Sequence, residues 1–426
     1  MWSACTPGDP GRGLRLANLL ANAKLPSNVL EKLNEIFEDT RHRDSGQTAQ
    51  YIPDLACVTP SLFSIVLCDM EVGAVPEHAA RRVSRPRRCP LSPTCLVLNI
   101  KCAQRHLDGG QGEGLVPPYA SGSLSLPLSL SLSRSLSACC DASSHYSITR
   151  PYVEGKIYSV GDASHRYTIQ SACKPVLYGI AMRECGESAV HAKVGNEPSG
   201  KPFDDLSIDL NGKAYNPMVN AGAIITASMS PGHSDRARYD FFEAAVRQMS
   251  HKDTAACYLN QSVYSSEMAT NARNQEIVDD LVKRKLVTAD PAESLSAYTM
   301  ACSLDIDTLD AAVIAATLAN RGTNPTTKEE VLPEVITDQI INVMMSCGMY
   351  NGAGKWIVDV GVPAKSGVSG VIMGVVPGVC GFAVFSPCLD QHGNSTRGVL
   401  VAKELSNSLG LHVLKNKSAG QAGPRA

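Results

Sequence analysis

A serine and a lysine three positions apart carry the clearest chemical signal in this chain of 426 residues. In Ser171-Ala172-Cys173-Lys174, a helical backbone places both polar side chains on one face. A serine hydroxyl becomes a good nucleophile only when a neighbouring base takes its proton. A lysine acts as that base when burial or nearby positive charge lowers its pKa. The pair therefore predicts nucleophilic catalysis, although a lone S-x-x-K more often marks a solvated helix face.

A second motif, Lys365-Ser366-Gly367-Val368, lies just before an apolar run that begins at Gly370. Glycine in or beside a strand lets a ligand approach the backbone closely. In penicillin-recognising enzymes an S-x-x-K serine and a later K-[ST]-G strand belong to one site, and the order is the same here. The S-D-N element of those enzymes is absent, which argues against a β-lactamase proper. By itself, K-S-G is usually an ordinary turn.

Five further polar residues have types suited to binding a small polar molecule. Asn220 lies in a stretch of small apolar residues, and Tyr298 and Tyr350 each lie near a cysteine. Glu267 and Asn274 are seven positions apart, so on one helix they would share a face. Each of the five, taken alone, is more typical of a surface residue or a hydrogen-bonded core residue. No HExxH motif or His/Cys cluster occurs, so no metal is expected.

The apolar pattern predicts a few strands at each end of the chain and many helices between them. This arrangement is an α+β fold with one sheet and a helical lobe. Helices are expected at 30–40, across Ser171 and Lys174, and at 239–249, 276–287, 309–320, 335–345 and 399–409. Strands are expected at 62–67, 157–160 and 166–169, with a hairpin at 370–385 that turns at Pro377-Gly378.

Residues 70–154 differ in composition from the rest of the chain. They contain a cluster of arginines and a Ser/Leu tract from Ser121 to Ser137, which offer little to build a packed core from. We expect this segment to be a disordered insert within one discontinuous domain, formed by residues 30–69 and 155–414. Residues 1–29 are expected to be a poorly ordered extension, and residues 415–426 a disordered tail.

The overall composition limits the partners and the compartment. The formal net charge is −2, whereas a nucleic-acid-binding protein usually has a basic face, so no nucleic acid is expected. The longest apolar run is broken by Pro377 and is too short to span a bilayer, so no membrane is expected. Fifteen cysteines without a CxxC pair favour free thiols in a reducing compartment. We therefore expect a cytoplasmic protein, with mitochondrial targeting as the alternative.

Read together, six short blocks of the sequence resemble the serine-dependent glutaminases. The blocks occur in the order of that family and, outside residues 70–154, close to its spacing. The resemblance covers about 30–69 and 155–414. The blocks are Tyr51-Ile52-Pro53, Gln170-Ser171-x-x-Lys174-Pro175, Val194-Gly195-x-Glu197-Pro198-Ser199-Gly200, Asn216-Pro217-Met218-Val219-Asn220-Ala221-Gly222-Ala223, Cys347-Gly348-Met349-Tyr350 and Pro363-Ala364-Lys365-Ser366-Gly367-Val368.

The resemblance implies a fold and a reaction. The fold is like that of β-lactamases and penicillin-binding proteins, an antiparallel sheet flanked by helices plus a helical subdomain. The reaction is hydrolysis of L-glutamine to L-glutamate and ammonia through an acyl-enzyme. Ser171 is then the nucleophile, Lys174 its base, and the N–H groups of Ser171 and Val368 form the oxyanion hole. The remaining glutamine-binding and proton-handling positions are Tyr51, Asn220, Glu267, Asn274, Tyr298 and Tyr350.

Physical chemistry is consistent with these roles. The ammonium of a free amino acid requires a carboxylate such as Glu267, and its carboxylate requires neutral donors such as Asn220, Asn274 and Tyr51. Glutamine and asparagine differ by one methylene, worth only ~1–3 kcal/mol in a pocket. The distance between Glu267 and Ser171 must therefore provide most of the selectivity.

The resemblance further implies a homo-oligomer, either a dimer or a tetramer. It implies no cofactor, and activation by inorganic phosphate, as in many members of the family. Two alternatives remain open at this stage. One is an impaired or inactive homologue whose sheet is disrupted by the insert. The other is a different serine hydrolase of the penicillin-recognising fold.

Overall fold

The computed structural model describes residues 24–43, 45–72, 153–206, 208–251 and 257–415. The predictions for residues 1–23, for 73–152 and for the tail from 416 onward lie outside these ranges. Within them, no helix combines the length and the apolar composition that crossing a bilayer requires.

The main sheet contains strands from both ends of the sequence, and all its neighbours are antiparallel. Its order is β2-β1-β8-β7-β6. The hairpin turns as predicted. Val379 N–H donates to the Val376 carbonyl at 2.9 Å, and Gly378 has φ +73°, the conformation that position i+2 of a type II turn requires. The strands are β1 (Ser64–Val72), β2 (Val153–Gly161), β6 (Ala364–Ser366), β7 (Val371–Val376) and β8 (Cys380–Phe385).

The strands on either side of the predicted insert pair with each other. Ile65 is opposite Val160 and Leu67 is opposite Tyr158, which confirms that the chain before and after the segment forms one sheet. The boundaries predicted for the insert were wrong, because residues 70–72 and 153–154 belong to β1 and β2. The backbone ladder continues there because main-chain hydrogen bonds do not depend on side-chain composition.

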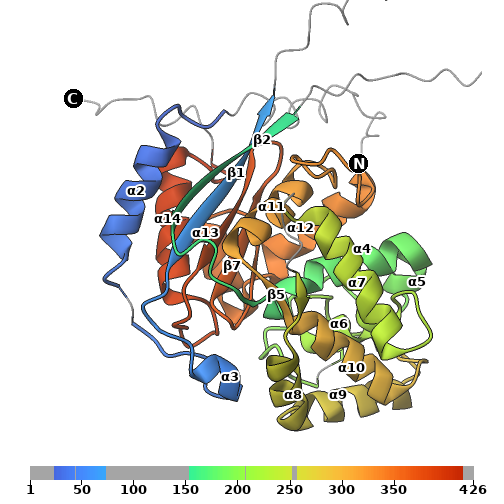
Figure 1. The fold of residues 1–426 in the computed structure, drawn as a ribbon. Coiled ribbons are helices and arrows are strands. Elements are labelled where there is room, and N and C mark those ends of the chain that lie inside the picture. Colours follow the sequence, from blue (N-terminus) through green and yellow to red (C-terminus); the bar gives the residue numbers. More distant parts are fainter. Residues whose placement is uncertain (1–23, 44, 73–152, 207, 252–256, 416–426) are drawn as a thin grey trace, which may run out of the picture. The chain divides into compact units, whose positions relative to one another are not determined.

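Each face of the main sheet is covered by helices (Figure 1). Ile65 and Leu67 pack with residues of α2 (Val29–Thr40), α13 (Ala353–Asp359) and α14 (Thr396–Leu409), whereas Val66 and Cys68 belong to the core around α11 (Thr308–Ala319). This alternation is the period of two that a strand imposes. The backbone of α11 approaches β8 so closely that a Cβ at Gly381 would lie 2.0 Å from Ala316 N.

A helical lobe lies beside the main sheet (Figure 1). The helix expected to contain Ser171 and Lys174 is a 3₁₀ helix at Ser171 and becomes α-helical at Lys174, and those expected at 239–249, 276–287 and 335–345 are confirmed with shifted ends. Helices α5, α6, α8 and α10 were not predicted. Buried α6 and α10 lack a polar face, so they show no amphipathic pattern to detect. The lobe contains α4 (Lys174–Cys185), α5 (Glu187–His191), α6 (Asn220–Ser228), α7 (Asp235–Met249), α8 (Gln261–Ala269), α9 (Ala272–Lys283), α10 (Pro291–Cys302) and α12 (Glu334–Cys347).

A small antiparallel sheet leads directly into the Ser171 turn. Its order is β3-β5-β4, formed by β3 (Tyr167–Thr168), β5 (Leu304–Ile306) and β4 (Tyr258–Leu259). Ile169 N–H, which follows β3, donates to the Leu304 carbonyl at 2.8 Å. Two 3₁₀ helices and one short helix complete the surroundings of the site: η2 (Gln170–Cys173), η3 (Tyr350–Gly352) and α3 (Pro53–Ala56).

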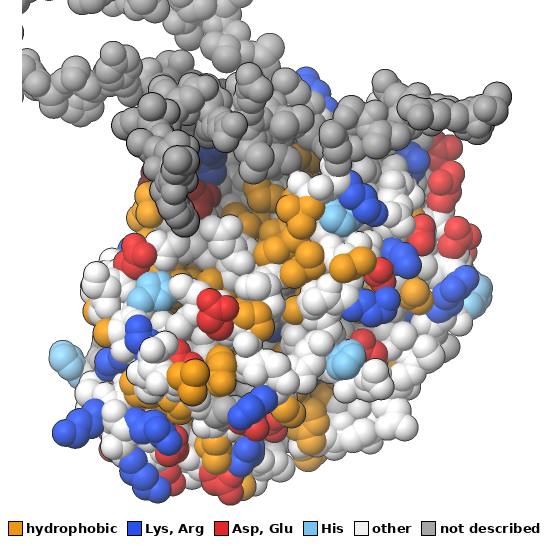
Figure 2. Space-filling view, turned by 180° about the vertical axis from the view of Figure 1, so that it is seen from behind, with side chains coloured by type: hydrophobic (Ala, Val, Ile, Leu, Met, Phe, Trp, Pro, Cys, Tyr) orange, Lys and Arg blue, Asp and Glu red, His pale blue; other side chains and the backbone are white. Residues whose placement is uncertain are grey.

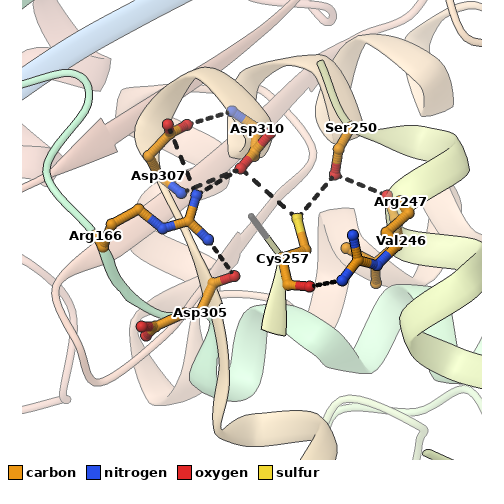
Figure 3. Close-up of polar contacts among 8 residues, drawn as sticks. All are labelled: Arg166, Val246, Arg247, Ser250, Cys257, Asp305, Asp307 and Asp310. Atoms are coloured by element: carbon orange, nitrogen blue, oxygen red, sulfur yellow. Dashed lines mark hydrogen bonds and ion pairs between the residues drawn. The ribbon is translucent and has the colours of Figure 1, made fainter. Parts of the chain in front are cut away.

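A partly buried ionic network anchors this small sheet to α11 and α7 (Figure 3). Arg166 Nη1 lies 3.3 Å from Asp310 Oδ2, and Arg166 Nη2 donates to the Asp305 carbonyl at 2.7 Å. Asp307 and Asp310 form the capping box that starts α11. Burial raises the pKa of Asp310 to about 6, and the thiol of Cys257 donates to Asp310 Oδ2 at 3.8 Å. The network therefore fixes the strand that precedes Ser171.

The opposite face of the molecule carries basic and acidic side chains close together (Figure 2). Interspersed charges of opposite sign largely cancel beyond a Debye length, ~10 Å at 0.1 M salt.

Candidate active site

Ser171 and Lys174 are in direct contact, as their spacing predicts. Lys174 Nζ donates to Ser171 Oγ at 3.0 Å. Ser171 lies in the 3₁₀ helix η2, and Lys174 is the first residue of α4. A 3₁₀ helix has three residues per turn, so its i and i+3 side chains lie one above the other. The predicted proximity is thus confirmed, with a tighter helix type than expected.

Lys174 is buried in surroundings that favour its neutral form. It is fully buried, and burial lowers its pKa to about 8. The rings of Phe203 and Tyr298, whose centres lie 5.9 Å and 5.8 Å from Nζ, contribute to this burial. A lysine with this pKa has an appreciable unprotonated fraction near neutral pH, as a general base requires.

Asn220 joins the dyad to the rest of the site. Its Oδ1 accepts from Lys174 Nζ at 2.7 Å and from the Tyr298 hydroxyl at 3.1 Å. Its Nδ2 donates to Asn274 Oδ1 at 2.8 Å. Three helices, α6, α9 and α10, thereby present a continuous polar chain that begins at the lysine.

Glu267 lies on the other side of this chain. Its Oε1 accepts from Gln170 Nε2 at 2.6 Å and from Ser303 Oγ at 3.4 Å. Burial raises its pKa to about 7, although the two hydrogen bonds oppose the shift. The prediction that Glu267 and Asn274 share a helix was wrong, because α8 ends at Ala269 and α9 begins at Ala272. Asn271, a helix-boundary residue type, starts the second helix.

Tyr51 and Phe203 lie where two cavities adjoin. A cavity of about 170 Å³ is lined by Tyr51, Phe203, Asn220, Glu267 and Asn274, among others. This cavity brings together the predicted ammonium anchor and all three predicted carboxylate donors. A more open cavity of about 520 Å³ also contains Tyr51 and Phe203, together with Tyr350 and Val368. Tyr51 is 55% exposed, so it forms part of the open rim of the site.

Tyr350 stands over the dyad in an uncommon backbone conformation, φ +50°. Its ring contacts the ring of Phe203, with 4.9 Å between centroids. Burial raises the pKa of Tyr350 above its usual range, and the hydroxyl of neighbouring Ser171 opposes this shift. Its hydroxyl oxygen is buried and interacts with Ser171, so it lies where it can act on a group bound to that serine.

Lys365 is a second buried lysine, which the residue roles assigned from sequence left out. Its Nζ donates to the Ser366 carbonyl at 2.6 Å and lies 4.3 Å from the centre of the Tyr350 ring. Burial and the charge of Lys174 lower the pKa of Lys365 well below its usual range. The K-S-G motif pointed to this position, but only the packing shows that the side chain lies behind Tyr350.

Gly367 brings Val368 next to the nucleophile turn. A Cβ at Gly367 would lie 2.8 Å from the Ile169 carbonyl oxygen and 3.4 Å from Gln170 Cβ, so only glycine fits without displacing them. In the described ranges, the N–H groups of Ser171 and Val368 take part in no backbone hydrogen bond. Both are therefore available to stabilise an oxyanion.

Three other residues of the site had no role assigned from the sequence. They are Gln170 and Ser303, which hold Glu267, and Phe203, which separates the cavities. Gln170 was visible as part of a motif. Phe203 and Ser303 had no signal, because their function depends on contacts between residues distant in sequence.

Comparison with known proteins agrees with this geometry. The Glutaminase family model matches residues 140–414. A glutaminase from Nostoc sp. is 42% identical over 276 residues, which are 65% of this chain and 82% of that protein. The chain belongs to the glutaminase family. The matched stretch 140–414 contains every predicted site residue except Tyr51, which lies on the other side of residues 73–152.

Other glutaminases extend the comparison. The glutaminase of Corynebacterium glutamicum is 38% identical over 272 residues, covering 62% of this chain and 64% of that protein. The solved structure of the probable glutaminase ybaS superposes with a TM-score of 0.69 at 27% identity, covering 92% of this chain and all of that one. A probable glutaminase from Bacillus subtilis, complexed with 6-diazo-5-oxo-L-norleucine, gives a TM-score of 0.65 at 26% identity, with 92% and 98% covered. The fold is therefore the β-lactamase-like fold of glutaminases, as predicted.

Proposed function

We propose that this glutaminase hydrolyses the side-chain amide of L-glutamine through an acyl-enzyme on Ser171. The contact of 3.0 Å between Lys174 Nζ and Ser171 Oγ, beside a cavity lined by Glu267, is the observation that carries the proposal. The neutral amine of Lys174 takes the proton of Ser171 as Oγ attacks the γ-carbonyl carbon. The carbonyl oxygen becomes an oxyanion, which the N–H groups of Ser171 and Val368 stabilise.

Collapse of the tetrahedral intermediate breaks the carbon–nitrogen bond. The leaving nitrogen takes a proton from the Lys174 ammonium, and the Tyr350 hydroxyl is the group we assign to relay it. Water then enters, gives its proton to Lys174 and attacks the acyl carbon. Loss of Ser171 Oγ from this second intermediate returns the proton to the serine and releases glutamate.

The anchoring roles follow from charge. The Glu267 carboxylate binds the substrate ammonium, while the Asn220 and Asn274 amides and the Tyr51 hydroxyl bind its carboxylate. All four residues line the smaller cavity. Charge-assisted hydrogen bonds of this kind are shorter and roughly twice as strong as neutral ones.

An ammonia-release assay tests the proposal. Purified protein is expected to release ammonia readily from L-glutamine, and slowly from L-asparagine and D-glutamine. A chromogenic β-lactam is expected to remain intact. Equal rates on glutamine and asparagine would contradict the assigned selectivity. The homo-oligomer and phosphate activation stay predictions, to be tested by sizing and assaying the protein with and without inorganic phosphate. The absence of a cofactor and the cytoplasmic location stay predictions too.

A further inference from the structure

One side chain links the residue next to the nucleophile with the substrate anchor. Gln170 immediately precedes Ser171 and is only 3% exposed. Its Nε2 donates to Glu267 Oε1 at 2.6 Å and to Thr168 Oγ1 at 3.2 Å. Gln170 therefore connects the predicted ammonium anchor to the predicted nucleophile through one side-chain amide and one peptide unit.

The backbone at Gln170 fixes where this link starts. Its φ is +51°, a region that non-glycine residues other than Asn and Asp seldom adopt. Two contacts maintain the conformation. Ile169 N–H donates to the Leu304 carbonyl at 2.8 Å, and Gly367 lies against Ile169 and Gln170 with no room for a Cβ. The Gln170 side chain thus leaves a rigid turn in one direction.

Ser303 provides an internal comparison. It donates to the same Glu267 oxygen at 3.4 Å, but it lies between α10 and β5 and is not adjacent to Ser171. In the described part of the chain, both hydrogen bonds to the Glu267 carboxylate use Oε1 and none uses Oε2. The second oxygen is therefore left for the ligand. Of the two donors, only Gln170 is adjacent to Ser171, so only Gln170 couples the position of the carboxylate to that residue.

We propose that Gln170 is a positioning residue that sets the distance between Glu267 and Ser171, and so the length of substrate side chain that the enzyme accepts. This inference rests on the roles proposed above for Ser171 and Glu267. A substrate shorter by one methylene then binds with its ammonium on Glu267 and its amide carbon short of Oγ. Asparagine is rejected by geometry, without any group that clashes with it.

Two substitutions of Gln170 test the proposal. Gln170→Asn keeps an amide, and asparagine tolerates the left-handed backbone, but the side chain is one methylene too short to reach Glu267. Gln170→Gly removes the side chain and the backbone strain together, so it guards against a failure to fold. Both variants are expected to reduce the preference for L-glutamine over L-asparagine, measured as the ratio of kcat/KM values, by ~10-fold, the scale of one methylene.

A pH profile separates positioning from general damage. The acid limb of kcat/KM reflects protonation of Lys174, whose pKa is about 8, and of Glu267. Because the Gln170 hydrogen bond lowers the pKa of Glu267, both variants are expected to move the Glu267 ionisation, and not that of Lys174, to higher pH. Other titratable groups near Glu267 are Tyr51, Tyr298 and Cys302, and Asp204 and Arg273 line the same cavity. Tyr51, Tyr298 and Cys302 all have raised pKa values and stay neutral across the acid limb.

Ser303→Ala is the matched control. It removes the other donor to Oε1, so it is expected to shift the acid limb in the same direction while leaving the glutamine preference unchanged. Thermal stabilisation by L-glutamate and by L-aspartate, measured on the same proteins, gives a readout that needs no turnover. Wild-type protein that releases no ammonia refutes the proposed function. An active wild type whose two Gln170 variants keep its substrate preference refutes only the inference, as does a Ser303→Ala variant that loses the preference equally.

Discussion

The site has a buried end, which we call the dry end, and a more exposed end, which we call the wet end. The polar side chains at the two ends differ in how far they are buried. At the dry end, Lys174 and Lys365 are fully buried and both have lowered pKa values. At the wet end, Tyr51 is 55% exposed and the polar groups of Asn274 and Glu267 line a cavity. Burial creates a neutral base where chemistry is needed. Equally complete burial of the Glu267 carboxylate would protonate it at neutral pH and remove the charge proposed to bind an ammonium. Partial burial already raises the pKa of Glu267 to about 7.

The largest expected effect comes from the dry end. Ser171→Ala is expected to abolish nearly all ammonia release, by at least ~10³-fold, while L-glutamate still stabilises the protein against heating. Lys174→Met keeps much of the buried volume, removes the base and is expected to be about as severe, because dyad members act as a unit. A variant that keeps a tenth of the wild-type kcat would remove its residue from the mechanism.

The pH dependence distinguishes the two ends. Lys174 must be neutral to act, so kcat is expected to fall as pH decreases through about 8, by up to ~100-fold at pH 6 for a single ionisation. Glu267 must be charged to bind free substrate, so kcat/KM is expected to show a further loss as pH decreases through about 7. Identical profiles for kcat and kcat/KM would mean that Glu267 does not bind the ammonium.

At the wet end, Glu267→Gln removes the charge and keeps the shape. It is expected to lower kcat/KM by the value of a charge-assisted hydrogen bond, ~1.5–3 kcal/mol or roughly 10- to 150-fold. Glu38→Gln, on the exposed side of α2, serves as the control because its carboxylate pairs with Arg41 at the surface and lines neither cavity. Loss of activity in both variants would point to long-range electrostatics and not to the anchor.

The smallest effect on activity is expected from replacing residues 73–152. Replacing residues 73–152 with an Asp-Gly turn joins Val72 to Val153, which already face each other across the β1–β2 ladder. Closing a loop of that length costs ~3 kcal/mol more than a tight turn, so the melting temperature is expected to rise while kcat/KM stays unchanged. A deletion that does not fold, or that folds without activity, would show that the segment belongs to the domain.

Prediction from the sequence succeeded where a signal was local. The spacing of Ser171 and Lys174 predicted their contact, and Pro377-Gly378 predicted the hairpin turn. It failed where neighbours in space are distant in sequence. The unpredicted helices α6 and α10 are examples, because a helix buried on all sides has no polar stripe.

By itself, the sequence determined the family and the fold, and it predicted the Ser171–Lys174 contact and the residue types proposed to bind an amino acid, because each depends on short motifs in a fixed order. Only the tertiary structure decided how far apart the dyad and the anchor lie, and which surroundings each has. Gln170 can donate a hydrogen bond to Glu267 only because β3 pairs with β5. Lys174 is excluded from solvent only because η2 packs against β6 and α4 packs against α6. Distances and pKa values arise from packing between segments far apart in the chain, and no local pattern encodes them.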